Sequence, residues 1–246
     1  MQRIKMTLTY DGTAFNGYQV QPNGRTVQEE LQRALKQMHK GEAVQVTGSG
    51  RTDARVHAFG QVIHFDTTLS IPLENWTKAL NAQLPDDVRV LHSEAVSSDF
   101  HARYDVVRKT YQYRVHNLAA VDVFRRNYAV HEPQTLDIME MKRAATYLSG
   151  EHDFTSFCAS KTDVKNKVRT IYRIEIEQVQ DELVFTFEGS GFLYNMVRIL
   201  MGTLFEVGKG RRSADDIPMI LEAKDRNKAG KTAPPHGLYL WKVSYS

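Results

Sequence analysis

The stretch that decides how this chain folds lies at residues 47–58 and reads Thr-Gly-Ser-Gly-Arg-Thr-Asp-Ala-Arg-Val-His-Ala. It has no amphipathic pattern, but alternating apolar residues precede it at Val44 and Val46 and follow it over residues 61–65. We therefore expect a loop between two strands. Its two glycines permit a tight bend or a close approach of another backbone segment.

The segments around this loop define the first half of the chain. Residues 3–10 alternate between apolar and polar and predict a strand. Apolar residues at helical spacing predict a helix that starts at Val27, where Thr26 and Glu29 form a capping box. A second helix opens after Pro72, and a strand covers residues 88–96. The order β-α-β-β-α-β is that of a ferredoxin-like unit.

The second half repeats this order of elements. The predicted segments are a strand at 110–116, a helix at 136–147, strands at 169–179 and 183–188, a helix at 192–207, a short helix capped at 213–216 and a strand at 238–243. We predict an α+β fold of two ferredoxin-like or RRM-like βαββαβ halves, residues 1–101 and 102–246, with largely antiparallel sheets. Helices on one face of each sheet would leave the other face open, which suits RNA.

Composition excludes several classes of protein. The chain has 246 residues, of which 41% are hydrophobic and 25% charged, as in ordinary globular proteins. No apolar run approaches the roughly 18 residues of a membrane span, and the first residues do not resemble a signal peptide. The single cysteine, Cys158, excludes an internal disulfide and a multi-cysteine metal site. We expect a cytoplasmic protein with no membrane association.

Charged side chains are distributed unevenly between the two halves of the chain. The total of +3 is too small to argue from, but residues 1–101 carry 10 basic and 11 acidic side chains, whereas residues 102–246 carry 22 and 18. Basic clusters lie at residues 108–109, 125–126, 161–173 and 208–212. They could follow a phosphate backbone or simply be solvated loop charges.

Two side chains in the loop could carry chemistry. Asp53 could be an exposed carboxylate held by the loop, with Arg51 beside it to bind a phosphate or ribose. The alternative is a capped turn in which Asp53 accepts backbone N–H groups. A metal site is disfavoured, because His57 and His64 are seven residues apart with no third ligand in a matching pattern. Cys158 has no obvious activating base and is interpreted as a packed thiol.

Motifs across nearly the whole chain resemble those of the tRNA pseudouridine synthase I (TruA) family. They are residues 48–54 (Gly-Ser-Gly-Arg-Thr-Asp-Ala), 56–58, 60–62, 10–13, 15–19, 100–103, 109–113, 150–154, 191–193, 196–198, 232–234 and 237–240. One residue departs from the family pattern: Arg55 occupies a position where the family usually has glycine. If the backbone there has a positive φ, Arg55 costs about 1 kcal/mol.

The resemblance implies that uridine is converted to pseudouridine at positions 38, 39 and 40 in the anticodon arm of tRNA. Asp53 matches the family's catalytic aspartate, and Arg51 its neighbouring arginine. Tyr111 matches the active-site tyrosine, although an inward-facing strand aromatic is the alternative. Arg198 matches an arginine that pairs with the aspartate, although it could instead extend from an apolar helix into solvent. By the same analogy, Leu238 and Leu240 line the uracil pocket.

The resemblance further implies a pseudouridine synthase fold with the catalytic cleft between the halves, and a homodimer. It implies no cofactor and no metal, because nothing is oxidised and no group is added. The alternative function is a non-catalytic tRNA-binding or chaperone module on the same fold. A small-molecule enzyme is disfavoured, because the chain has no phosphate or cofactor motif.

Overall fold

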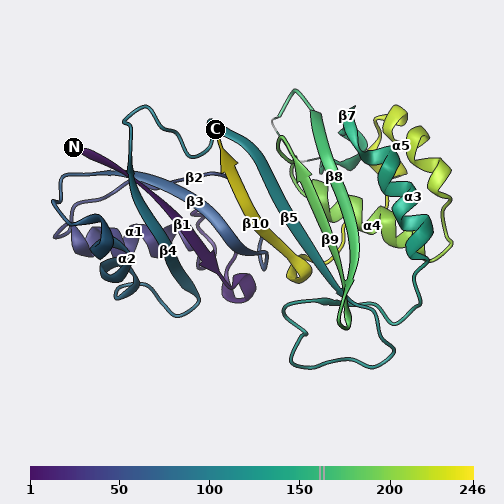
Figure 1. Ribbon diagram of the computed structural model, residues 1–246, viewed down its shortest axis with the longest axis horizontal. Helices are drawn as coiled ribbons and strands as arrows, with labels where there is room; N and C mark the ends of the chain where they lie inside the picture. Colours follow the sequence, from purple (N-terminus) through teal and green to yellow (C-terminus); the bar gives the residue numbers. More distant parts are fainter. Residues whose placement is uncertain (161, 163) are drawn as a thin grey trace. The chain divides into compact units, whose positions relative to one another are not determined.

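The computed structural model describes every residue except 161 and 163, so Lys161 of the predicted basic clusters lies outside the described residues. The chain forms two compact units (Figure 1). Unit 1 comprises Met1–Val107 and Tyr239–Ser246, and unit 2 comprises Arg108–Leu238. The predicted boundary at residues 101/102 therefore moves to 107/108, and the last strand belongs with the first unit instead of the second.

Unit 1 is built on a sheet with the strand order β4 (Val88–Val96), β1 (Gln2–Tyr10), β3 (His57–Thr67), β10 (Leu238–Tyr245). The first three strands are antiparallel, and β10 runs parallel to β3. A two-residue strand, β2 (Thr47–Gly48), also pairs with β3. Residues 49–56 of the 47–58 stretch thus connect two strands that are hydrogen-bonded to each other.

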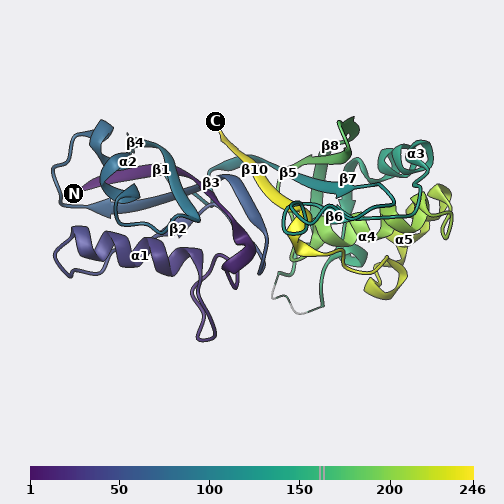
Figure 2. The ribbon, with the colours of Figure 1, turned by 90° about the horizontal axis from the view of Figure 1, so that it is seen from below.

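Alternation along β1 explains how unit 1 builds its core. Ile4, Met6 and Leu8 are fully buried, and the residues between them are partly exposed. Helices α1 (Val27–Met38) and α2 (Leu73–Asn81) contact each other, and α1 lies lengthwise along the sheet (Figure 2). Trp76 of α2 packs edge-on against Phe65 of β3, with ring centroids 5.5 Å apart.

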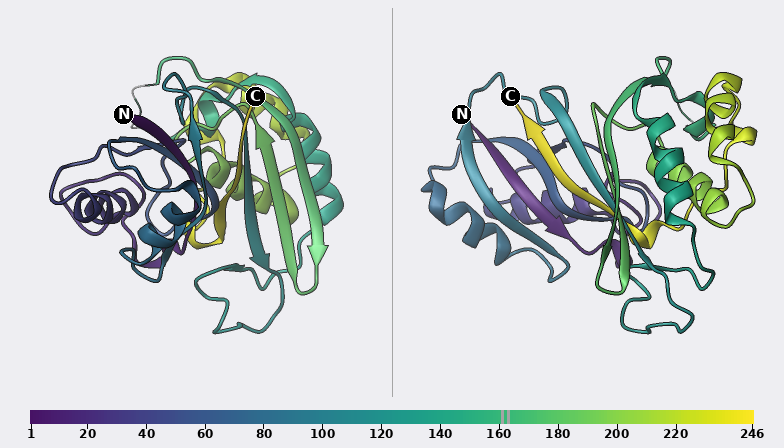
Figure 3. Two further views of the ribbon diagram at one scale, coloured as in Figure 1. Left: turned by 60° about the vertical axis from the view of Figure 1, so that its left-hand side comes forward. Right: turned by 45° about the vertical axis from the view of Figure 1, so that its right-hand side comes forward.

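In unit 2 the sheet strands have the order β5 (Val106–His116), β9 (Glu182–Gly189), β8 (Val168–Val179), β7 (Gly150–Asp153), and neighbours in this order are antiparallel. Strand β6 (Val130–His131) pairs in parallel with β5. Helices α3 (Ile138–Leu148), α4 (Met196–Gly208) and α5 (Ile217–Ala223) lie together on one side of this sheet (Figure 3). The predicted mixed α/β architecture with largely antiparallel sheets is confirmed.

Short 3-10 turns complete the chain at Gly12–Ala14 (η1), Thr155–Phe157 (η2), Ala214–Asp216 (η3), Arg226–Lys228 (η4) and Pro235–Gly237 (η5). Helix α4 forms the centre of unit 2, and Gly202 permits its closest contact. A Cβ at that position would lie 1.6 Å from the carbonyl oxygen of Lys231, so only glycine fits.

Two predicted elements are wrong in their position. The strand expected at Val44–Val46 is found instead at Thr47–Gly48, within the predicted loop. The helix expected from Phe192 begins at Met196, because Asn195 has a φ of +60° and cannot continue a right-handed helix backward. The helix starts at Val27 and Leu73 and the capping box at Ser213 are confirmed.

Within the part of the chain that the structure describes, none of the helices is long and apolar enough to cross a membrane.

A buried histidine in unit 1 makes folding sensitive to acid. His64 Nδ1 accepts the N–H of Ala102 at 3.1 Å, and its side chain is buried. Burial is the main reason that the pKa of His64 falls to about 4, and the positive charge of Arg3 acts in the same direction. The unfolded chain takes up this proton below about pH 6.5, so the free energy of unfolding decreases as the pH falls from about 6.5 toward 4.

We expect His64→Asn to reduce this pH dependence, because the asparagine Oδ1 can accept the same N–H but does not titrate. The measurement is the urea midpoint of both proteins at intervals from pH 7.5 to pH 4. Parallel curves for the parent and the variant would contradict this role for His64.

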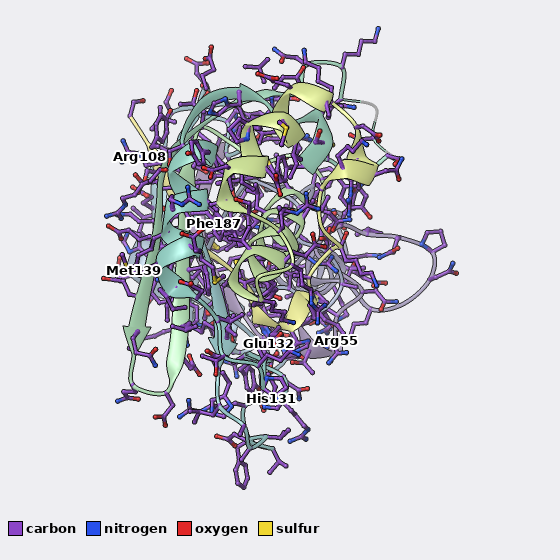
Figure 4. The ribbon with its side chains drawn as sticks, turned by 90° about the vertical axis from the view of Figure 1, so that its right-hand side faces the viewer. Arg55, Arg108, His131, Glu132, Met139 and Phe187 are labelled. Atoms are coloured by element: carbon purple, nitrogen blue, oxygen red, sulfur yellow. The ribbon has the colours of Figure 1, made fainter. Side chains whose placement is uncertain are left out.

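Arg55 has a φ of +65°. This is the left-handed conformation considered above for the position at which the family usually has glycine. Its side chain is exposed (Figure 4), so little packing offsets the strain.

We expect Arg55→Gly to raise the free energy of unfolding by about 0.5–1 kcal/mol, and Arg55→Ala to give no such gain. Lys40→Gly is the matched control, since Lys40 has a φ of +54° elsewhere in unit 1. Denaturant unfolding measures all three, and a loss of stability in Arg55→Gly would refute the strain.

Candidate active site

The loop that carries Asp53 is fixed on its N-terminal side by one buried glutamine. Gln61 of β3 accepts the hydroxyl of Ser49 at 2.6 Å and donates to the carbonyl oxygen of Gly50 at 2.9 Å. The N–H of Ser49 also donates to the carbonyl oxygen of Val62 at 2.7 Å. Ser49 and Gln61 are both fully buried, so these bonds are protected from water.

The centre of the loop is held by the segment that follows β1. The hydroxyls of Tyr10 and Thr52 are hydrogen-bonded at 2.8 Å, and Tyr18 N–H donates to the carbonyl oxygen of Thr52 at 3.0 Å. Gly17, with a φ of +96°, allows this approach, because a Cβ there would lie 2.8 Å from the same carbonyl oxygen. The two motifs at residues 10–19 and 47–58 therefore form one packed structure.

The C-terminal side of the loop turns back through Arg55. Its N–H donates to the carbonyl oxygen of Phe15 at 3.1 Å, and Val56 N–H donates to the carbonyl oxygen of Asp53 at 3.1 Å. Thr52 and Val56 are buried on either side, while Asp53 is half-buried. The buried neighbours fix the backbone of Asp53, and the residue itself keeps part of its surface accessible.

The two histidines considered as metal ligands have other partners in unit 1. His57 Nδ1 accepts the N–H of Gly12 at 3.0 Å, and its ring stacks on Tyr239 with centroids 4.7 Å apart. His64 Nδ1 accepts the N–H of Ala102. Both rings therefore have structural roles in unit 1.

Tyr111 lies in the middle of β5, opposite Phe187 of β9. Its side chain is 8% exposed, and its ring meets Phe192 edge-on at a centroid distance of 5.2 Å. This contact fixes the plane of the Tyr111 ring. A small part of the side chain stays accessible, so the inward-facing strand aromatic considered as the alternative describes most, but not all, of its surroundings.

Arg198 lies in the first turn of α4 and is half-buried. Its Nε donates to the carbonyl oxygen of Ala233 at 2.8 Å, and its Nη1 donates to Oδ1 of Asn195 at 2.9 Å. Ala233 N–H in turn donates to the Arg198 carbonyl oxygen at 3.0 Å. These bonds hold the guanidinium against the Ala233 and Asn195 positions of its own unit.

The four candidate residues are divided between the units. Asp53 and the exposed Arg51 belong to unit 1, and Tyr111 and Arg198 belong to unit 2. Leu238 and Leu240 are buried at the start of β10. Cys158 is also buried, which raises the pKa of its thiol, as expected for a packed cysteine.

Sequence reasoning missed the residues that hold the candidates in place. Gln61, Tyr10 and Tyr18 were noted only as parts of motifs, and Asn195 was placed inside a helix. The signal for Asn195 was its position before an apolar helix, because asparagine tolerates the left-handed conformation better than other side chains.

Comparison with known proteins identifies the family. A family model described as tRNA pseudouridine synthase matches residues 6–105 and 144–246. A tRNA pseudouridine synthase A from Geobacillus sp. (strain WCH70) is 58% identical over 99% of this chain and 98% of its own length. The protein of the same name from Anoxybacillus flavithermus is 59% identical over 100% and 99%. A tRNA pseudouridine synthase A 1 from Bacillus cereus is 56% identical over the full length of both.

Similarity to solved structures is much lower. The crystal structure of the archaeal box H/ACA Nop10–Cbf5 complex is 12% identical, with a TM-score of 0.39 over 82% of this chain and 44% of that chain. Nothing about function rests on that similarity. The family model and the full-length relatives place this chain in the tRNA pseudouridine synthase family, whose members are isomerases.

Proposed function

We propose that this enzyme forms pseudouridine at positions 38, 39 and 40 in the anticodon arm of tRNA, with Asp53 as the nucleophile. The observation that carries the proposal is the support around Asp53. Polar contacts from Gln61, Tyr10 and Tyr18 fix the loop, yet Asp53 as a residue is only half-buried. Such support is what a reacting group needs, because it must be held in place and still reach its substrate.

The reaction breaks the N1–C1′ bond of uridine, turns the base and joins C5 to C1′. A carboxylate suits this chemistry, because it can attack and then leave again. Attack on the sugar, attack on the base and a glycal route all begin with an ionised Asp53. No electron is transferred and no group is added, so the reaction requires no cofactor.

A stacked uridine has to leave the helix before its base can turn, which costs a few kcal/mol. Arg51, exposed and two residues before Asp53, is suited to occupy the vacated space or to bind a neighbouring phosphate. Tyr111 is suited to stack on the detached uracil, because Phe192 holds its ring in one plane. Its hydroxyl can then help to remove the C5 proton, directly or through water.

Arg198 is assigned the role of the cation that pairs with the Asp53 carboxylate. Asn195 and Ala233 hold its guanidinium in place. A guanidinium held in this way can donate to both oxygens of a carboxylate. Asn195 is therefore proposed as a positioning residue that acts through Arg198.

The partners and the compartment complete the proposal. The protein acts on the anticodon arm as a homodimer in the cytoplasm. The rival function, a tRNA-binding or chaperone module without catalysis, shares the RNA contacts and differs only in the need for Asp53.

Asp53→Asn distinguishes the two functions. With tRNA tritiated at uridine C5, we expect the parent to release tritium and the variant to release it roughly 10³-fold more slowly or not at all. Binding of tRNA should change little, because the side chain keeps its size. Asp86→Asn is the matched control, since Asp86 is exposed and, among the described residues, forms an ion pair only with Arg89 on its own turn. Tritium release by Asp53→Asn at the parental rate would remove Asp53 from the mechanism, and inactivity of the parent would favour the binding module.

Asn195→Gly tests the positioning of Arg198. Glycine adopts a φ of +60° without strain, so the variant removes the amide contact without disturbing the backbone. We expect the kcat of pseudouridine formation to fall by roughly 10-fold, because the guanidinium of Arg198 is held less firmly in its place.

The control for this prediction is a double-mutant cycle with Arg198→Met. If Asn195 acts through Arg198, adding Asn195→Gly to Arg198→Met produces no further loss. Losses that multiply in the double variant would mean that Asn195 acts independently of Arg198.

A further inference from the structure

Arg169, the second residue of β8, is a half-buried arginine. Its Nη1 donates to the carbonyl oxygens of Asn166 at 3.0 Å and Val168 at 2.6 Å. Among the described residues it forms no ion pair with a carboxylate, and burial lowers its pKa. Its acceptors within the described part of the chain are therefore neutral and do not balance its charge.

Other arginines of the same sheet are neutralised. Arg108 of β5 (labelled in Figure 4) pairs with Glu188 at 2.7 Å. Arg173, on the same strand as Arg169, is exposed and pairs with Glu175 at 2.6 Å. Arg169 therefore differs from Arg108 and Arg173 in having no acidic partner among the described residues.

Arg169 lies against the turn that leads to Phe192. Thr170 and Ser190 exchange two hydrogen bonds, of 3.1 Å from Thr170 N–H to the Ser190 hydroxyl and 2.9 Å from Ser190 N–H to the Thr170 carbonyl oxygen. A Cβ on Gly191 would lie 3.9 Å from Arg169 Nε. Phe192 continues from this turn to the ring of Tyr111. Arg169 and Tyr111 therefore flank the same short turn.

A second cation strengthens the positive potential here. Lys167 is half-buried and, like Arg169, forms no ion pair within the described residues. Although burial raises the pKa of the nearby Cys158 thiol, the charges of Lys167 and Arg169 both act to lower it. Two partly buried cations that act on the same thiol create a positive potential that favours an anion, and a guanidinium can bind two oxygens of a phosphate at once.

We propose that Arg169, supported by Lys167, binds one phosphodiester of the tRNA backbone adjacent to the nucleotide that Tyr111 holds. The site rests on the proposed function, because that function supplies the nucleotide at Tyr111. RNA is the occupant that fits, since an aromatic ring and a cation flanking one turn match a base and its neighbouring phosphate. The phosphate contact fixes the register of the strand, and the adjacent ring receives the base.

The test compares Arg169→Gln with Arg173→Gln, which removes the same charge from the same strand. For binding to unmodified tRNA we expect Arg169→Gln to raise Kd roughly 10-fold and to reduce the slope of log K against log salt by about 1. Arg173→Gln should change both quantities little. Equal effects of the two variants would overturn the proposal, because they would reduce it to overall charge.

A synthetic anticodon stem-loop in which single phosphates are replaced by neutral methylphosphonates locates the contact. The parent should lose affinity at one linkage beside the target uridine, and Arg169→Gln should be insensitive to that same replacement. If Arg169→Gln is penalised at that linkage as strongly as the parent, or if no linkage beside the target affects the parent, the proposal is wrong. A site for free phosphate would produce that second result.

Two further measurements separate this proposal from other failures. Arg169→Lys keeps the charge and is expected to restore the salt slope but not the full affinity, which a variant that merely misfolds would not do. Tritium release by the parent is assayed in parallel. A parent that binds tRNA but releases no tritium refutes the proposed function, whereas an active parent with an unaffected Arg169→Gln refutes only the phosphate site.

Discussion

The position of the Asp53 loop depends on the hydrogen bonds that Gln61 of β3 forms with Ser49 and Gly50, the two residues directly after β2. Its amide accepts from Ser49 and donates to Gly50, so it satisfies both ends of its polar group while it holds the loop entrance. A buried amide of this kind permits only one register, because a shift would leave donors and acceptors without partners. Because Ser49 and Gly50 are held by these bonds, the backbone that leads to Asp53 is held as well.

Positive φ angles mark the two places where backbone conformation bears on the candidate site. Arg55 ends the Asp53 loop at +65°, and Asn195 begins α4 at +60°. In each case the unusual residue redirects the chain within a few residues of a charged side chain, Asp53 or Arg198. Strain of this kind persists only where surrounding contacts determine it, as the bonds of Arg55 to Phe15 and of Asn195 to Arg198 do.

The sequence predicted elements with strong periodicity and failed where local backbone geometry decided the outcome. Helix α1 starts at Val27 as its cap predicted, and β1 buries the alternating residues. The start of α4 was misplaced, because the apolar pattern of residues 192–195 is equally compatible with a buried turn. The last strand was assigned to the second half, because β10 joins β3 through a pairing between distant parts of the chain that no local pattern contains. The family motifs indicated Asp53, Tyr111 and Arg198, but the roles of Gln61 and Asn195 emerge only from their hydrogen bonds.

The return of β10 to the first unit has a consequence for the loop. The chain passes between the units twice, after Val107 and after Leu238. The second passage leads directly into Tyr239, whose ring stacks on His57 at the end of the loop. His57 in turn accepts the N–H of Gly12, where a Cβ would lie 2.1 Å from the carbonyl oxygen of Val56. The entry of β10, the 3-10 turn after β1 and the segment after Asp53 are therefore packed against one another, and a displacement of any one of them would be transmitted to the backbone that carries Asp53.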